Sequence, residues 1–292
     1  MQRRTFLQTL LLSTGTMLTF SAFKNHIYSQ SIDSELMPAM FIGHGSPMNA
    51  IEENEFTKEW KKEASLLPIP IAILCISAHW FTRGTFVAVT PQPETIHDFG
   101  GFPKALFDTQ YPASGAPELA HFTQHIIQST QVQTDADWGL DHGTWSILKQ
   151  MYPEAKIPVF QLSIDYAKPP QFHYELGKEL LELRKKGVLI IGSGNIVHNL
   201  GRVNFQQIDA AYDWNIEFDT KIKNFINTQN HQGVIDYQKL GSIAQLAVPS
   251  PDHYLPLLYT LGLQQKNEAA TFFNEKYMAG SLSMTSVKIM KG

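Results

Sequence analysis

The feature that most constrains the fold is a series of short apolar runs beyond residue 38 that are nearly continuous rather than alternating. Strands with this pattern are typical of a sheet buried on both faces. The strands expected on this basis are Ala39 to Ile42, Ile69 to Ser77, Thr85 to Thr90, Pro158 to Ile164 and Val188 to Ile191. The run from Thr85 follows its predecessor so closely that antiparallel pairing between the two is open.

Segments with helical periodicity lie between these runs. The apolar residues that repeat at helical spacing are Phe172, Leu176, Leu180 and Leu183 in one segment and Phe218, Ile222 and Phe225 in another, with weaker candidates at 118–128 and 146–151. Strands that alternate with helices predict an α/β fold, here three α/β/α layers around a mostly parallel or mixed central sheet. In such folds the active site lies beyond the carboxyl ends of the strands.

The first 35 residues differ in character from the rest of the chain. Arg3 and Arg4 precede Phe6, Leu7 and a mild apolar stretch, an outline typical of a twin-arginine export signal followed by a polar linker. Ser, Thr and Gly interrupt that stretch, and it is shorter than the ~20 residues of a membrane span, so we expect no stable span after processing. The expected location is the periplasm or the exterior, or the cytoplasm if the signal is not used.

Residues 36–292 contain no internal repeat, low-complexity tract or flexible linker, which predicts a single catalytic domain. The 23 basic and 27 acidic residues give a formal net charge of -4 and are spread along the chain. Because no basic stripe is present to neutralise phosphates, nucleic acid is not expected as a partner. A monomer and a small homo-oligomer both remain open.

Histidines follow several of the expected strands. His44, His79 and His198 each come shortly after a buried apolar run, in loops that contain glycine or serine. His253 lies in the first turn of an expected helix that opens at Ser250. Imidazole is a common ligand of zinc, iron and copper, and loops at one rim of a sheet bring distant positions within ligand distance. The pattern therefore predicts a metal site at the carboxyl rim of the sheet.

Two further histidines, His97 and His142, lie in loops rich in aspartate and glycine, TIHDFGGFP and GLDHGTW, and we expect His97 to contact the substrate. Aromatic residues also gather near these histidines, and we expect Trp80, Phe81, Phe99 and Phe102 to offer an apolar wall to a substrate. Arg83 is a candidate partner for a substrate carboxylate. His142 and His198 are both candidates for a general base.

Seven blocks between Pro38 and Val287 resemble the class III extradiol dioxygenases of the protocatechuate-4,5-dioxygenase type, and most closely their 4,5-DOPA extradiol dioxygenase branch. The blocks are PAMFIGHGSPMNA, ISAHWFTRG, TIHDFGGFP, WGLDHGTWSIL, GSGNIVHNL, PDHYLPLLY and GSLSM. The resemblance implies a three-layer α/β/α fold and metal ligands at His44, His79, His198 and His253. His198 therefore has two expected roles, ligand and base.

The resemblance also implies the chemistry. We expect a catechol to bind at a ferrous ion held by His44, His79 and His253, to lose protons to a nearby base, and to be opened by dioxygen beside the diol. Non-haem iron oxygenases usually use two histidines and one carboxylate, whereas His253 stands where we expect the carboxylate. A neutral ligand there can favour Zn(II), which is unable to pass an electron to dioxygen, so we expect Fe(II) to be required for activity.

Two alternative functions stay open at this point. A zinc hydrolase would use the same histidines to activate water, but it usually needs an acidic general base, and none is obvious in the histidine loops. An exported metal-binding protein without catalysis would need no aromatic-lined cleft.

Overall fold

The computed structural model describes residues 36–292, which belong to one compact unit. The proposed export signal, residues 1–35, lies outside the described residues. The described part contains no helix long and apolar enough to cross a membrane.

A six-stranded sheet runs through this unit in the order β6-β2-β8-β1-β12-β9. Its strands are β1 (Ala39–Gly43), β2 (Ala72–Ser77), β6 (Val159–Gln161), β8 (Val188–Gly194), β9 (Glu268–Phe273) and β12 (Ser286–Lys291). The first four of these pair in parallel, and β12 and β9 add antiparallel partners at the β1 side. The sheet is therefore mixed and mostly parallel, as the apolar runs predicted.

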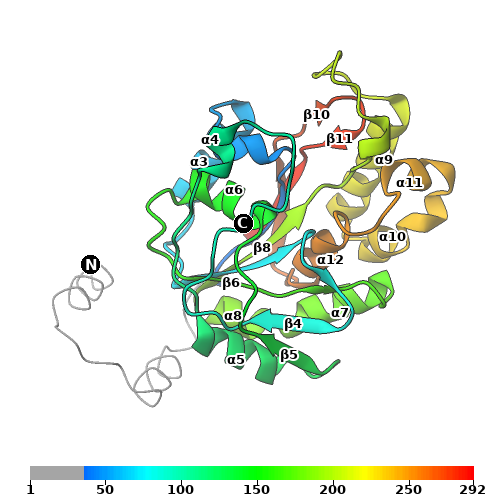
Figure 1. Ribbon diagram of the computed structural model, residues 1–292. Coiled ribbons are helices and arrows are strands. Elements are labelled where there is room, and N and C mark those ends of the chain that lie inside the picture. The colour runs from blue at the N-terminus through cyan, green and yellow to red at the C-terminus, as the bar shows by residue number, and fades with distance from the viewer. Residues whose placement is uncertain (1–35) are drawn as a thin grey trace. The chain divides into compact units, whose positions relative to one another are not determined.

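Helices cover both faces of the sheet (Figure 1). On one face α6 (His142–Met151) packs against β2 and β8, and α3 (Glu55–Leu66) packs on α6. On the other face α12 (Leu255–Gly262) packs against β8 and β1, beside α7 (Pro170–Glu179) and α8 (Leu181–Lys185). The three-layer α/β/α expectation is confirmed.

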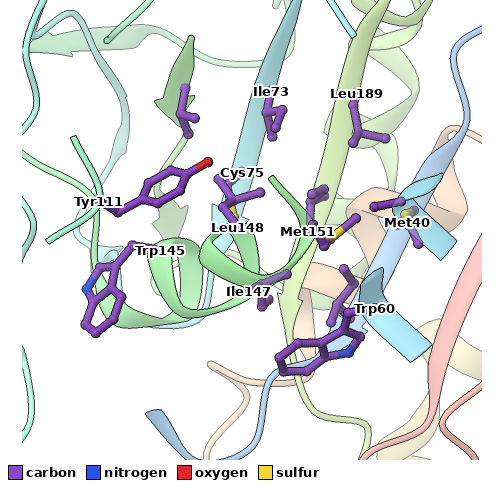
Figure 2. Close-up of a cluster of buried hydrophobic side chains, with 14 of the residues drawn as sticks. Met40, Trp60, Ile73, Cys75, Tyr111, Trp145, Ile147, Leu148, Met151 and Leu189 are labelled. Atoms are coloured by element: carbon purple, nitrogen blue, oxygen red, sulfur yellow. The ribbon is translucent and has the colours of Figure 1, made fainter. Parts of the chain in front are cut away.

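The core between α6 and the sheet explains why these segments form their elements. Figure 2 shows Leu148 and Met151 of α6 facing Ile73, Cys75 and Leu189 of the sheet. Every residue of β1, β2 and β8 is buried, because the helical layers on the two faces take alternate side chains. Asp141 caps α6 by accepting a hydrogen bond from the backbone N–H of Thr144.

The remaining elements lie around this frame. Small two-stranded sheets are formed by β3 (Phe81–Thr82) with β7 (Ile164–Asp165), β4 (Thr85–Ala88) with β5 (Val132–Asp135), and β10 (Tyr277–Met278) with β11 (Leu282–Ser283). The other helices are η1 (Pro47–Ala50), α4 (Lys104–Phe107), α5 (Pro117–Ile126), η2 (Leu200–Arg202), α9 (Asp213–Asn227), α10 (His231–Ile235), η3 (Tyr237–Leu240) and α11 (Ser242–Ala247).

Several local expectations need correction. The strand at Thr85 does not pair antiparallel with its predecessor but parallel with β5, in a separate sheet. The run from Pro158 divides into β6 and β7, which belong to different sheets. His253 lies in a turn just before α12, because the helix begins only at Leu255. The strands β9 and β12 were not expected, since polar residues such as Glu268, Thr271 and Lys288 break their apolar runs.

Candidate active site

Three histidine side chains meet at the carboxyl rim of the sheet. His44 directly follows β1, His79 comes two residues after β2, and His253 precedes α12. One ligand nitrogen from each lies within 4.8 Å of the others, and the Nε2 atoms of His44 and His79 are 3.2 Å apart. Because β1 and β2 both run parallel to β8, their ends deliver these side chains to the same rim.

In two of these rings Nδ1, the nitrogen that points away from the other histidines, already has a hydrogen-bond partner. Nδ1 of His44 lies 2.9 Å from Oγ of Ser193, and that hydroxyl donates to the backbone carbonyl of Gly143. The Ser193 oxygen must therefore accept, so His44 carries its proton on Nδ1. Nδ1 of His253 lies 2.8 Å from Oδ2 of Asp252 and donates to that carboxylate. Both rings consequently keep the Nε2 lone pair for a ligand role.

The electrostatics favour neutral imidazoles. Burial lowers the pKa of His44 and of His79, and the neighbouring histidines lower both pKa values further. Burial alone would raise the pKa of Asp252, but the hydrogen bond and charge contact with His253 outweigh it, and the pKa falls below its usual range. The site thus combines neutral ligand nitrogens with an ionised carboxylate behind one of them.

Three converging imidazoles fit a divalent ion such as iron or zinc. The inner group contains no carboxylate, in agreement with His253 standing at the expected carboxylate position. The negative charge lies instead one hydrogen bond further out, at Asp252. That arrangement orients the ring of His253 and raises its basicity as a ligand.

A second group of potential ligands adjoins the first and shares His79 with it. Nδ1 of His142 lies 3.0 Å from Oδ1 of Asp98, and Nδ1 of His79 lies 3.5 Å from Oδ2 of the same carboxylate. The contact with the His142 ring is out of line for a hydrogen bond, although the backbone N–H of His142 donates to Oδ1 at 2.9 Å. Burial raises the pKa of Asp98, but these histidine contacts outweigh it and lower the pKa to about 2.

Aromatic rings flank His142. The ring of Phe99 meets His142 edge-on at 5.5 Å and contacts Phe102 at 5.4 Å between centroids. His97 contacts Phe99 and Trp145, while its Nε2 lies 2.9 Å from the backbone oxygen of Thr109, to which it donates. The structure therefore places Phe99 beside the histidines, with Phe102 packed against it, and turns the polar edge of His97 toward the backbone.

His198 stacks on His253 with the ring centroids 3.5 Å apart and the planes within 6°. Burial and, to a smaller extent, the neighbouring His253 lower the pKa of His198 to about 3, against the opposing charge of Asp252. Among the described residues, the groups able to hold a metal are His44–His79–His253 and His79–Asp98–His142, and neither includes His198. His198 thus lies beside the proposed ligand His253. Its own roles as metal ligand or general base stay predictions.

The other expected substrate contacts lie in different surroundings. Trp80 is buried and stacks on Trp138, with the ring centroids 5.1 Å apart. Phe81 packs against Tyr166, and Arg83 is exposed in the turn between β3 and β4. Substrate binding by Trp80, Phe102, His97 and Arg83 stays a prediction.

Three important residues were missed by sequence reasoning. Asp252 could have been found, because it directly precedes His253. Asp98 is 44 residues from His142 and Ser193 is 149 residues from His44, so no local pattern joins either pair. Asp98 also removes one argument against a hydrolase, since an acidic group does stand beside the histidines. Its low pKa makes it a weak base, however.

Comparison with known proteins assigns the chemistry. Residues 37–287 match the family described as the catalytic LigB subunit of aromatic ring-opening dioxygenase. The chain is 46% identical to the 4,5-DOPA dioxygenase extradiol of Escherichia coli over 88% of this chain and 96% of that protein. It is 36% identical to the enzyme of the same name from Beta vulgaris, over 88% and 97% of the two chains.

A solved structure shows the same fold. The crystal structure of an uncharacterised protein from Escherichia coli K12 superposes with a TM-score of 0.77 at 41% identity, and the match covers 88% of this chain and all of the other. Family and fold agree with the histidine cluster at the rim of the sheet. The chain therefore belongs to the LigB family and is a metal-dependent extradiol dioxygenase, an oxidoreductase that opens the ring of a catechol-type substrate with dioxygen.

Proposed function

We propose that the substrate is a 4,5-DOPA-like catechol and that the active metal is Fe(II), held by His44, His79 and His253. The observation that carries the proposal is the convergence of these three rings next to the His142–Asp98 pair and Phe99. The relatives named 4,5-DOPA dioxygenase extradiol, which match over nearly their whole length, support the substrate class. We expect the enzyme to act as a monomer or small homo-oligomer.

Bound Fe(II) supplies the one-electron chemistry that allows dioxygen to react with a catechol. The chain's own residues prepare the substrate. Nδ1 of His142 faces the Asp98 carboxylate, so its Nε2 is the nitrogen available to accept a proton from a catechol hydroxyl. The negative charge of Asp98 stabilises the imidazolium that forms.

His142 is a better candidate for the base than His198. A base works best when its pKa lies near the working pH, and the pKa of His198 is lowered to about 3. His198 packs flat against His253 and can hold that ring in place. Phe99 and Phe102 form an apolar surface at the edge of His142 on which an aromatic ring can rest.

Metal reconstitution tests the proposal. Protein freed of metal and reloaded anaerobically with Fe(II) should consume dioxygen and yield a ring-opened semialdehyde acid from 4,5-DOPA-like catechols. Protein loaded with Zn(II), which can occupy the same site, should consume none. A panel of substituted catechols gives the specificity. If the Fe(II) protein turns over no catechol, the substrate and metal assignments are both wrong.

We also propose that the chain is exported through the twin-arginine pathway, which carries folded proteins and so suits an enzyme that loads its metal in the cytoplasm. The support is the pair Arg3 and Arg4 ahead of the mild apolar stretch. Changing both arginines to lysine in the source organism should leave the protein in the cytoplasm. Cell fractionation reports the result, and unchanged export would reject the signal.

A further inference from the structure

A buried carboxylate that is absent from both metal-ligand groups lies directly behind them. Asp141 is completely buried and receives three hydrogen bonds. Oδ1 accepts from Oγ of Ser77 at 2.6 Å and from the backbone N–H of Thr144 at 3.1 Å, and Oδ2 accepts from Nε2 of Gln161 at 2.6 Å. Because every partner donates, the geometry suits an ionised carboxylate, even though burial raises the pKa of Asp141.

The partners of Asp141 lead to the histidines. Ser77 ends β2, and its Oγ also accepts from the backbone N–H of His79 at 3.3 Å. Asp141 itself is the cap residue of α6, whose first residue is His142. One carboxylate thus ties the strand that carries a proposed ligand to the helix that carries the proposed base.

The first turn of α6 also connects to His44. The backbone carbonyl of Gly143 accepts from Ser193 at 2.6 Å, and Ser193 accepts from His44. No side chain fits at Gly143, since a Cβ there would lie 2.6 Å from Oγ of Ser77 and 2.8 Å from Cδ2 of His79. A shift of this turn would therefore displace His44, His79 and His142.

We infer that Asp141 is a positioning residue of the ring-opening reaction, which sets the place of His142 relative to His79 through its bonds to Ser77, Thr144 and Gln161. The inference rests on the proposed role of His142 as base. Misplacement of a reacting group by ~1 Å can lower the rate by about 100-fold, so a small movement of this turn is enough to slow ring opening.

The reciprocal pair of Asp141 and Gln161 offers a precise test. Oε1 of Gln161 accepts from the backbone N–H of Asp141 at 3.2 Å, while its Nε2 donates to Oδ2. In Asp141→Asn the new amide nitrogen faces Nε2 of Gln161, and turning the Gln161 amide over only moves the donor clash to the backbone N–H. The double variant Asp141→Asn/Gln161→Glu removes the clash, because both glutamate oxygens accept, and it restores the negative charge.

We expect Asp141→Asn to fold and to lower kcat per bound iron by ~10-fold to 100-fold, with KM changed by less than about 3-fold. The double variant should recover kcat to within about 3-fold of wild type. The metal dissociation constant should rise by ~10-fold or more in the single variant, as for loss of an outer partner, and recover in the double. Wild-type kcat per bound iron in the folded single variant, or a double variant that regains thermal stability without kcat, overturns the inference.

Two controls separate positioning from stability. Asn230→Ala removes the cap of α10 and should lower Tm while leaving kcat unchanged. If Asp141→Asn fails to fold, Ser77→Ala removes only the link to β2, and an unchanged kcat in that variant overturns the inference as well. Should wild type open no catechol, or His142→Gln keep full turnover, the proposed function fails, and the metal dissociation constants still test the tie between Asp141 and His79.

Discussion

At the scale of single residues, the histidines of the site differ in the group that contacts Nδ1 of each ring. His44 and His253 are backed by acceptors, the Ser193 hydroxyl and the Asp252 carboxylate, which leave Nε2 open. The His142 ring is backed by Asp98, as expected for a base whose protonated form needs a counter-charge. Metal content and turnover, measured together, distinguish the two classes.

Loss of a ligand should empty the site. His44→Ala and His79→Ala should fold yet bind metal more weakly by more than the ~10–100-fold typical of an outer partner, because each removes a direct bond to the ion. Metal content after dialysis, with a defined free metal concentration, measures the effect. His121→Ala, at an exposed histidine on α5, is the matched control and should keep full metal. Stoichiometric metal in both ligand variants would reject the assignment.

Loss of the base should spare the metal. His142→Gln should keep the fold and most of the iron but lower turnover at saturating catechol by ~100-fold or more. His198→Gln is the informative comparison, because a metal ligand there would lose iron along with activity. If neither variant slows ring opening, the proton goes elsewhere and the proposed first step is wrong.

At the scale of elements, the site depends on how closely the turn before α12 approaches the end of β8. The backbone N–H of Asn195 donates to the carbonyl of His253 at 2.9 Å, and a Cβ on Gly194 would lie 2.1 Å from that oxygen. Only glycine therefore fits at position 194 without a steric clash. The hairpin of β10 and β11 supports the loop that carries His198, because Leu282 of β11 forms an antiparallel β-bridge with His198.

Gly194→Ala should therefore push the His253 turn away from the sheet. We expect a loss of about 1–3 kcal/mol in the free energy of unfolding, together with weaker metal binding. Denaturant unfolding and metal titration measure the two effects. Gly100→Ala serves as the control, because a Cβ there meets nothing within 4 Å. A folded Gly194→Ala protein with wild-type metal affinity would contradict the argument.

At the scale of the whole molecule, buried neutral histidines link stability to pH. His173 is fully buried between α7 and α12, where Nδ1 meets the hydroxyl of Tyr259 at 2.9 Å. Burial lowers the pKa of His173 to about 4 from the ordinary value of 6.5. Between these two values the unfolded chain binds more protons than the folded protein, so stability rises with pH and is lost as the pH falls below 6.5.

The metal-free protein should accordingly lose up to about 2 kcal/mol through His173 alone between pH 7 and pH 5. His173→Gln can keep a bond to Tyr259 without titrating, so its stability should fall less over that range. Denaturant unfolding of both proteins at several pH values provides the comparison. Parallel curves for wild type and variant would show that His173 contributes nothing to the pH dependence.

The sequence by itself determined the layered α/β fold, because runs such as residues 72–76 are apolar at every position and need cover on both faces. It also placed His44 and His79 after strands, and so at one rim. The antiparallel strands β9 and β12 were not predicted, because both mix polar with apolar residues. Only β9 is an edge strand, since β12 lies between β1 and β9.

Only the tertiary structure decided which residues stand behind the histidines. Ser193 reaches His44 because β8 lies between β1 and β2, and Asp98 reaches His142 because its loop folds over the start of α6. Contacts between residues so distant in the chain depend on strand order and packing, which no local pattern encodes. Local periodicity reports which side chains are buried, whereas the roles of Asp98, Asp141 and Ser193 depend on the groups that meet them there.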